Sequence, residues 1–245
     1  SHNFIMMIKR LFITLILLSG TAIADKDTVI NNLERFFGTI EKEDIMDSPF
    51  NGVYEVIVYN PVDSLLVSKD GQYIIQGDVV DLTTRKLLPI SDKVKLIKAT
   101  LINSINDQDK IIYKADNEKY SINVFTDVDC PFCRKLHLGM DKMNELGITV
   151  KYLAAPLASL HPTAQSKMQK IWCADDRNLA LDNYNIDKEV PDVDSCNDPV
   201  AEQLSLSKQL SVTGTPALFL SDGTHLPGYL RPDLLFKKIK QTLGQ

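Results

Sequence analysis

Residues 125–137 read Phe-Thr-Asp-Val-Asp-Cys-Pro-Phe-Cys-Arg-Lys-Leu-His, and this stretch decides the fold. An apolar run of high strand propensity, residues 122–125, leads into it. Over residues 130–146, apolar side chains then recur every three or four positions, which predicts a helix. The Cys-x-x-Cys motif at 130–133 is therefore expected between a strand and a helix, at the start of the helix.

This position has a chemical consequence for Cys130. The first N–H groups of a helix are unpaired and its macrodipole places partial positive charge there, so a thiolate is stabilised. We expect the pKa of Cys130 to fall below the free value of about 8.5, with its sulfur accessible. Pro131 suits the first turn because it needs no N–H donor. Cys133 lies one turn on and can close a disulfide with Cys130.

The four cysteines are best explained by one redox pair and one structural pair. The motif predicts a redox dithiol with Cys130 as the nucleophile, and a structural disulfide or half of a zinc site is the alternative. Cys173 and Cys196 are left for a structural disulfide, although two other pairings stay open from the residues alone. Neither belongs to a second Cys-x-x-Cys, so a zinc ribbon is disfavoured and no metal site is expected.

Composition and charge limit the class of protein. The 245 residues are 44% hydrophobic and 24% charged, which is typical of a globular chain with one large or two modest domains. The formal net charge is −5, and no basic stretch is interleaved with aromatic residues. Nucleic-acid binding is therefore not expected.

The N-terminus is typical of a secretory signal peptide over residues 1–24. Lys9 and Arg10 precede an apolar core at 11–18, and Ala22-Ile23-Ala24 fits a small-x-small cleavage site. An uncleaved membrane anchor is the alternative, but eight apolar residues fall short of the roughly 20 that span a bilayer as a helix. We expect cleavage after Ala24 and export to a compartment that permits disulfides.

The segment that follows predicts a small domain of one helix and an antiparallel sheet. We expect a helix over 25–45, and strands over 53–59, 64–68 and 73–82, with a hairpin turn at 69–72. So small a domain is marginal alone, and pairing with a second copy through an exposed strand edge is one remedy. A helix over 92–109 then reads as a connector, unless it packs wholly within one domain.

From residue 111 onward, strands alternate with helices in a thioredoxin-like order. The order is strand, helix, strand, helical insertion, hairpin and helix. The expected elements are strands at 119–126, 148–153, 213–220 and 226–230, and helices at 130–146, 162–173, 179–184, 200–210 and 232–243.

Pro216 precedes the apolar run 217–220, and proline is tolerated at the start of a strand. In a thioredoxin-like fold, this position carries a cis-proline loop opposite the Cys-x-x-Cys motif. The Thr215 backbone there can pair with an extended substrate segment. An ordinary trans turn proline is the alternative, and the presence of the motif favours cis.

Several stretches together resemble the periplasmic disulfide isomerases of the DsbC type and, less closely, those of the DsbG type. The resemblance covers nearly all of the chain after residue 24. The stretches that carry it are residues 73–78, 124–130, 135–137, 146–150, 171–174, 214–217 and 227–229.

The resemblance implies an α+β fold and a V-shaped homodimer. It divides the chain into a dimerisation domain at 25–91, a linker helix at 92–110 and a thioredoxin-like catalytic domain with a helical insertion at 111–245. The family's nucleophile falls on Cys130, its resolving cysteine on Cys133, its cis-proline on Pro216 and its second disulfide on Cys173–Cys196.

The implied function is isomerisation of incorrect disulfides in exported proteins within the periplasm. A DsbD-type membrane reductant would recharge the dithiol, and no metal or organic cofactor is implied. Here Pro131-Phe132 stands between the cysteines, where isomerases of this type usually carry Gly-Tyr and the DsbG type carries Pro-Tyr. Two alternatives are therefore kept: a DsbG-like reductase of sulfenylated cysteines, and a chaperone-like holdase.

Other polar residues near the motif receive plainer interpretations. Asp127 and Asp129 are interpreted as caps or turn formers rather than proton relays. His137 is interpreted as a packing or surface residue, His161 as a loop residue, and Arg134 as a solvated side chain.

Overall fold

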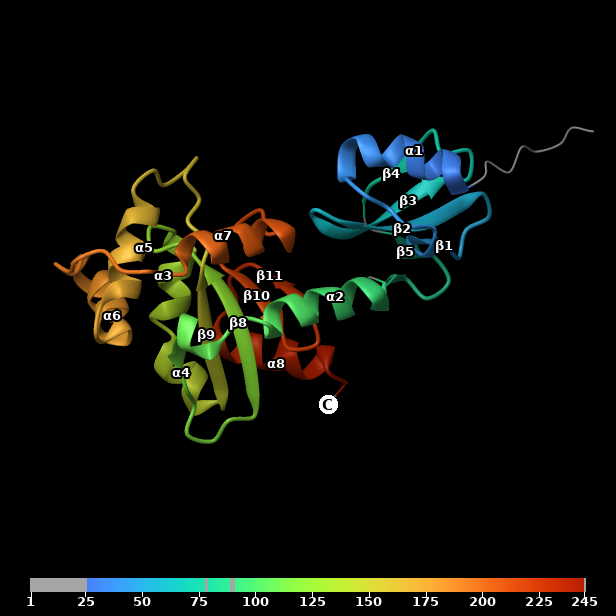
Figure 1. Ribbon diagram of the computed structural model, residues 1–245. Coiled ribbons are helices and arrows are strands. Elements are labelled where there is room, and N and C mark those ends of the chain that lie inside the picture. Colours follow the sequence, from blue (N-terminus) through green and yellow to red (C-terminus); the bar gives the residue numbers. More distant parts are fainter. Residues whose placement is uncertain (1–25, 78, 89–90, 245) are drawn as a thin grey trace, which may run out of the picture.

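The computed structural model describes residues 26–77, 79–88 and 91–244, and Figure 1 shows the chain folded into two parts joined by helix α2. The signal peptide over 1–24 and its cleavage site lie outside the described residues. Within the described ranges, no helix is both long and apolar enough to cross a bilayer.

The N-terminal part is a four-stranded antiparallel sheet covered by one helix. The strand order is β1-β2-β3-β4, and α1 buries Val29 and Leu33 against the sheet residues Val56 and Val67. A separate two-stranded ribbon, β5-β6, follows. The elements are α1 Lys26–Phe37, η1 Lys42–Asp44, β1 Ile45–Asp47, β2 Val53–Tyr59, β3 Val62–Ser68, β4 Ile74–Ile75, β5 Val80–Asp81 and β6 Lys86–Leu87.

Two expected elements differ in this part. The helix expected over 25–45 ends at Phe37 because Gly38 turns into the left-handed region with φ +77°, and strand β1 begins at Ile45. The strand expected over 73–82 is reduced to β4 and β5, with Gly77 at φ +139° between them. The hairpin turn expected at 69–72 is confirmed, since β3 and β4 pair antiparallel across it.

Helix α2, Asp92–Asn103, contacts both parts of the molecule. Its first turn packs Val94 against Ile57 and Val62 of the N-terminal sheet. Its last turn packs Ile102 against Phe125 in the C-terminal sheet. The helix is shorter than the expected 92–109, because the chain leaves it at Ser104 and forms the separate turn η2, Asp107–Asp109.

The C-terminal part is a five-stranded mixed sheet with helices on both faces (Figure 1). The strand order is β11-β10-β8-β9-β7, in which only β8 and β9 run parallel. This is the expected thioredoxin-like arrangement. The elements are β7 Ile111–Tyr113, β8 Tyr120–Thr126, α3 Pro131–His137, α4 Met140–Glu145, β9 Ile148–Ala154, α5 Ala164–Cys173, α6 Arg177–Asp187, α7 Val200–Gln209, β10 Ala217–Leu220, β11 His225–Pro227 and α8 Pro232–Thr242.

The single helix expected over 130–146 is divided into α3 and α4. The break falls at Leu138-Gly139, where Gly139 lies against helix α8: a Cβ there would stand 3.0 Å from Cγ of Pro232. The apolar pattern continues through the break because Leu136, Met140 and Met143 all enter the same core. The periodicity therefore predicts the burial of these three residues correctly, but Phe132 at the start of the pattern is exposed and the helix is not continuous.

The helical insertion consists of α5, α6 and the segment that leads to α7. Cys173 at the end of α5 forms a disulfide with Cys196, with an S–S distance of 2.03 Å. Trp172 next to it is fully buried, and its indole N–H donates to the carbonyl of Asp109 at 2.9 Å. The insertion is therefore anchored both by a covalent bond and by the core.

Candidate active site

Cys130 is the residue that caps helix α3. It has an extended backbone, with φ −74° and ψ 122°, and its carbonyl accepts the first helical hydrogen bond from Arg134 N–H at 3.1 Å. Pro131 occupies the first helical position. Strand β8 ends at Thr126, so a loop of three residues carries the chain from the centre of the sheet to the motif.

The two motif sulfurs are free thiols in different surroundings. Cys130 is 7% exposed and Cys133 is 3% exposed, and the N–H of Asp127 points at Cys133 Sγ from 3.5 Å. The expectation of an accessible Cys130 sulfur is therefore wrong: Cys130 is buried, and the carbonyl of Thr215 lies 3.2 Å from its sulfur. Cys130 remains the more exposed of the pair and the one that faces the loop around Pro216.

The surroundings push the pKa values of the two thiols apart. The pKa of Cys130 is lowered to about 5, chiefly because the Cys133 thiol donates a hydrogen bond to its sulfur, and backbone N–H groups of Cys133 and Phe132 add to the effect against the cost of burial. Burial raises the pKa of Cys133 well above its usual range, and the neighbouring Cys130 thiolate adds to this. One sulfur is thus poised as a thiolate and the other as a thiol.

The loop opposite the motif carries the expected proline. The Thr215–Pro216 peptide bond is cis, and the carbonyl of Thr215 lies 3.2 Å from Cys130 Sγ, where it accepts from the protonated thiol. The Thr215 hydroxyl is buried, finds no hydrogen-bond partner among the described residues, and lies close enough to help lower the pKa of Cys130. Strand β10 holds the loop there by pairing Ala217 with Phe125.

Of the residues singled out from the sequence, Cys130, Cys133, Thr215 and Pro216 come together. Cys173 and Cys196 lie in the helical insertion and are bonded to each other, so neither is available to the motif. Within the described part of the chain, no group of three or more His, Cys, Asp or Glu side chains is placed to hold a metal ion.

Asp127 is more deeply involved in the site than the interpretation as a turn former suggested. Its side chain is fully buried, and Oδ1 accepts from the N–H of Asp129 at 2.8 Å, which is the expected turn. Oδ2 also accepts from Leu157 N–H at 2.7 Å and contacts His161 Nδ1 at 2.9 Å. Asp127 therefore fixes the segment after β9 beneath the motif. No sequence signal linked it to a histidine 34 positions away.

The remaining polar residues stand away from the sulfurs. His137 is buried as a packing residue: its Nε2 lies 2.9 Å from Asp182 Oδ1, and its ring meets Tyr113 edge-on. Burial lowers its pKa, so it is neutral at pH 7. Arg134 is only partly solvated, because its Nε donates to the carbonyl of Asn185 at 2.7 Å.

The exposed rim of the motif is apolar and cationic. Phe132 is 54% exposed, its ring lies 6.4 Å from that of Tyr229, and the Lys135 ammonium stands 5.1 Å over it. A protein chain that approaches Cys130 meets these side chains.

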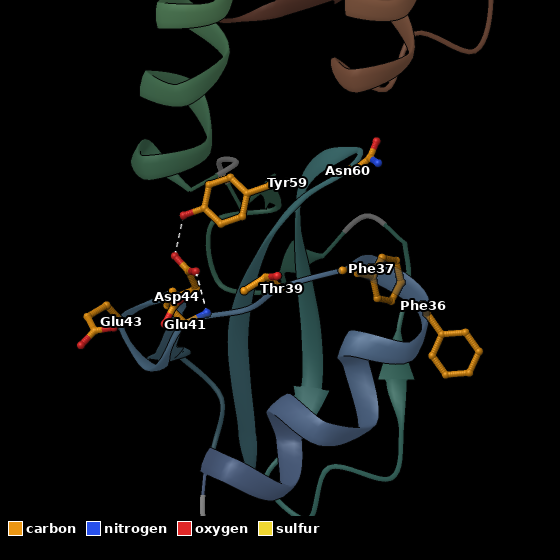
Figure 2. Close-up of a pocket in the computed structure, with 9 residues that line it drawn as sticks. Phe36, Phe37, Thr39, Glu41, Glu43, Asp44, Tyr59 and Asn60 are labelled. Carbon is orange, nitrogen blue, oxygen red and sulfur yellow. Dashed lines mark hydrogen bonds between the residues drawn. The ribbon is translucent and has the colours of Figure 1, made fainter.

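A separate hollow of about 660 Å³ lies in the N-terminal part (Figure 2). It is lined by Phe36, Phe37 and Tyr59, with Glu41 and Glu43 at its edge. Figure 2 shows the Tyr59 hydroxyl directed at Asp44, to which it donates at 2.6 Å. None of the lining residues belongs to the C-terminal part, so this hollow is distinct from the thiol site.

Two family models and several curated proteins match the chain. The model described as "Disulfide bond isomerase protein N-terminal domain" matches residues 20–91, and "Thioredoxin-like domain" matches 107–243. Thiol:disulfide interchange protein DsbC of Escherichia coli K12 is 38% identical over 235 residues, which cover 96% of this chain and 94% of that protein. The chain belongs to the DsbC family. DsbC of Haemophilus influenzae is 32% identical over 240 residues, 96% of this chain and 99% of that protein.

A solved structure agrees with the DsbC assignment. A disulfide interchange protein from Neisseria gonorrhoeae is 33% identical, with a TM-score of 0.50 over 55% of this chain and 97% of that one. The family, the α+β fold with its thioredoxin-like domain, and thiol:disulfide interchange of the isomerase type are confirmed by these matches.

Proposed function

We propose that Cys130 and Cys133 carry the disulfide isomerase reaction of this DsbC-family protein, with Cys130 as the nucleophile. One observation supports this most: Cys130 stands at the N-cap position of α3 with the pKa of its thiol lowered to about 5, and its sulfur lies beside the carbonyl of Thr215. At pH 7 such a thiol is ionised by about a hundred to one. Thr215 and Pro216 form the edge along which an extended client segment pairs.

The reaction begins when the Cys130 thiolate attacks one sulfur of an incorrect disulfide. A new S–S bond forms between enzyme and client, the client disulfide breaks, and the second client sulfur leaves as a thiolate. That thiolate, or another client thiolate, attacks a different client sulfur. A final attack on the mixed disulfide releases Cys130 as a thiolate, so isomerisation needs no net oxidant or reductant.

Cys133 provides the exit from a stalled mixed disulfide. Its thiol loses a proton and attacks Cys130, which forms the Cys130–Cys133 disulfide and releases the client as a dithiol. The enzyme is then oxidised by two electrons. A DsbD-type membrane reductant restores the dithiol by the reverse exchange.

The protein acts in the periplasm, on disulfide-containing exported proteins, as a homodimer. The signal peptide over 1–24 is cleaved after Ala24, and the mature chain consists of a dimerisation domain at 25–91, a linker helix at 92–110 and a catalytic domain at 111–245. Exposed apolar side chains on the small N-terminal strands, including Ile75 and Val80, support pairing there.

The test is refolding of a scrambled multi-disulfide protein by the reduced enzyme. We expect the native pairing to be restored faster by the wild type, and Cys130→Ala to fall to the uncatalysed rate, because the only sulfur in line with the Thr215 loop is then gone. Equal rates for the two proteins contradict the proposal. A Cys173→Ser, Cys196→Ser protein serves as the control for loss of sulfur elsewhere; because removal of this disulfide lowers stability, it is assayed under conditions in which its circular dichroism matches that of the folded wild type.

The same proteins separate the alternatives. A reductase of sulfenylated cysteines would turn over a sulfenylated protein faster than a scrambled one; Pro131 in the motif, shared with the DsbG type, is the observation in its favour. A holdase would suppress aggregation equally well as Cys130→Ala, Cys133→Ala. We expect the scrambled protein to be the better substrate of the wild type.

A further inference from the structure

The residue directly before the nucleophile is an acid, and this needs an explanation. Asp129 is adjacent to Cys130 in the chain, and its side chain is only 18% exposed, so water screens its charge incompletely. A nearby carboxylate opposes the formation of a thiolate, because two negative charges repel. A lone Asp129 would therefore work against the chemistry of Cys130.

The structure shows how this carboxylate is held. Its Oδ2 accepts from the ammonium of Lys167 at 2.7 Å, and its Oδ1 accepts a short hydrogen bond from the hydroxyl of Tyr184. Lys167 belongs to α5 and Tyr184 to α6, so both partners come from the helical insertion. Tyr184 is itself buried in the main core, which fixes its hydroxyl.

A second cation strengthens this arrangement. The ammonium groups of Lys167 and Lys188 lie 5.7 Å and 4.7 Å from the centre of the Tyr184 ring. Burial raises the pKa of Asp129, but the hydrogen bonds from Lys167 and Tyr184 outweigh it and the pKa is lowered overall. The pKa of Lys167 is raised, chiefly by its hydrogen bond to Asp129. Both groups are therefore charged at neutral pH and form an ion pair.

We propose that Lys167 and Tyr184 are positioning residues of the thiol reaction, which cancel the charge of Asp129 and fix its carboxylate so that the Cys130 thiolate forms beside an ion pair. This rests on the proposed role of Cys130 as the nucleophile. It gives the helical insertion a part in the chemistry that the Cys-x-x-Cys motif and the cis-proline loop do not supply.

The other charged and titratable groups near the motif are already engaged. The Cys133 thiol donates to Cys130. Arg134 on α3 donates to the carbonyl of Asn185. Beneath the loop, the Asp127 carboxylate is held by His161 and two backbone N–H groups. Arg134 keeps its charge in its contact with Asn185, but the cation that pairs with Asp129 is Lys167 of the insertion, with Lys188 nearby.

The experiment measures the ionisation of Cys130 in the full-length reduced protein. The rate of alkylation by iodoacetamide is recorded against pH, with Cys130→Ala as the blank. The variants are Lys167→Met, which removes the charge and keeps the stem, Asp129→Asn, and the two combined. Lys170→Met is the matched control, because Lys170 is an exposed lysine on the same helix.

Lys167→Met removes the ion-pair partner of Asp129 and leaves only the Tyr184 hydrogen bond, so we expect the alkylation midpoint to rise by about one pH unit. Adding Asp129→Asn to it removes the repulsion and returns the midpoint to the wild-type value or below. Lys170→Met leaves the midpoint unchanged. The proposal is overturned if Lys167→Met has no effect, if Lys170→Met has the same effect, or if the double variant keeps the full rise.

A second variant is available in case the first does not fold, and a separate result tests the proposed function. If Lys167→Met does not fold, as judged by its circular dichroism and melting temperature, Tyr184→Phe is used; it removes one hydroxyl and raises the midpoint by a smaller amount. The proposed function fails separately: a wild-type protein whose thiol titrates near the free value, or which refolds scrambled clients no better than Cys130→Ala, contradicts the role of Cys130 itself.

Discussion

The two parts of this molecule bury their sheets to different extents. In the C-terminal part, helices cover both faces of the sheet, and the central strand β8 is buried along almost its whole length. In the N-terminal part, α1 covers one face, the first turn of α2 packs on Ile57 and Val62 elsewhere in the sheet, and both residues of β4 are exposed, with Ile75 at 51%. The C-terminal part therefore leaves its central strand covered, whereas the N-terminal part leaves an apolar strand exposed.

The comparison explains why a redox enzyme carries a second domain. A thiol site needs a rigid frame to hold two sulfurs and a loop in register, and the C-terminal core with its disulfide supplies that frame. The small N-terminal core supplies little stability of its own. In the proposed homodimer, its exposed apolar strands are the surface that meets the second chain. Four experiments test this division of roles.

The largest effect is expected from truncation of the two cores. Trp172→Ala empties a fully buried site and should cost about 3–5 kcal/mol of unfolding free energy in the C-terminal part. Leu33→Ala is the matched change in the N-terminal part. Chemical denaturation at two protein concentrations distinguishes the two variants. The transition of the N-terminal part, which Leu33→Ala weakens, should depend on protein concentration, because that part is coupled to dimerisation. The transition of the C-terminal part, which Trp172→Ala weakens, should not. If both transitions were independent of protein concentration, the N-terminal part would not be coupled to dimerisation and the proposed difference between the parts would be contradicted.

The next effect comes from the disulfide between Cys173 and Cys196. It closes a loop of sequence separation 23, so its removal in Cys173→Ser, Cys196→Ser should cost about 3 kcal/mol. Hydrogen exchange read by mass spectrometry should show the loss of protection in α5 and α6 and none in α1. An equal loss in α1 would mean that the two parts unfold as one unit.

A smaller, pH-dependent effect is expected from Asp44 in the N-terminal part. Burial opposes its charge, but hydrogen bonds from Lys93 and Tyr59 outweigh this and lower its pKa. A depressed folded-state pKa stabilises the fold above the ordinary value near 4, and this is lost as pH falls through the folded value. Asp44→Asn should therefore cost about 1–2 kcal/mol at pH 7, reduced for the partly exposed Lys93, and much less near pH 3.

The melting of the Asp44→Asn protein, followed from pH 7 to pH 3 beside the wild type, checks this prediction. Helix α2 begins beside this site, because Lys93 Nζ lies 2.7 Å from Asp44 Oδ1. A penalty that stays constant with pH would show that the carboxylate charge is not what stabilises this contact.

The smallest effect on folding stability is expected from a substitution in the exposed strand β4. The same substitution should have the most direct effect on dimerisation. Ile75→Glu should change the unfolding free energy of the isolated subunit by no more than about 0.5 kcal/mol, since the side chain is exposed. Sedimentation should nevertheless show monomers, because a charge is placed on the apolar surface. Leu160→Glu is the control: this leucine of the C-terminal part is even more exposed, 69% against 51% for Ile75, and its substitution should leave the dimer intact.

Much of this architecture can be predicted from the sequence, and the predictions that are wrong have physical causes. The strand before the motif and the positions of Cys130 and Pro216 are local features, which propensity and spacing predict. Gly38 ends α1 with a positive φ, yet the apolar pattern continues past it, because Ile40 in the following loop and Ile45 in β1 enter the same core. Periodicity reports burial and does not report where the backbone turns.

The supporting contacts of the site could not be predicted. Lys167 and Tyr184 look like ordinary helix residues, and they reach Asp129 only because the insertion folds back onto the motif loop. The same is true of His161 and Asp127. Residues that carry the reaction are marked by their motif, whereas residues that surround it are defined by the tertiary fold.

The burial of Cys133 beneath Cys130 has a practical consequence. Cys133 is the more deeply buried of the two motif residues, 3% exposed against 7% for Cys130, so we expect a covalent intermediate with a client to form at Cys130. Replacement of Cys133 by alanine removes the enzyme thiol that would resolve this intermediate and leaves its release to client thiolates. Such a variant, expressed in cells and purified without reductant, would carry its natural clients as covalent adducts and so identify them directly by mass spectrometry.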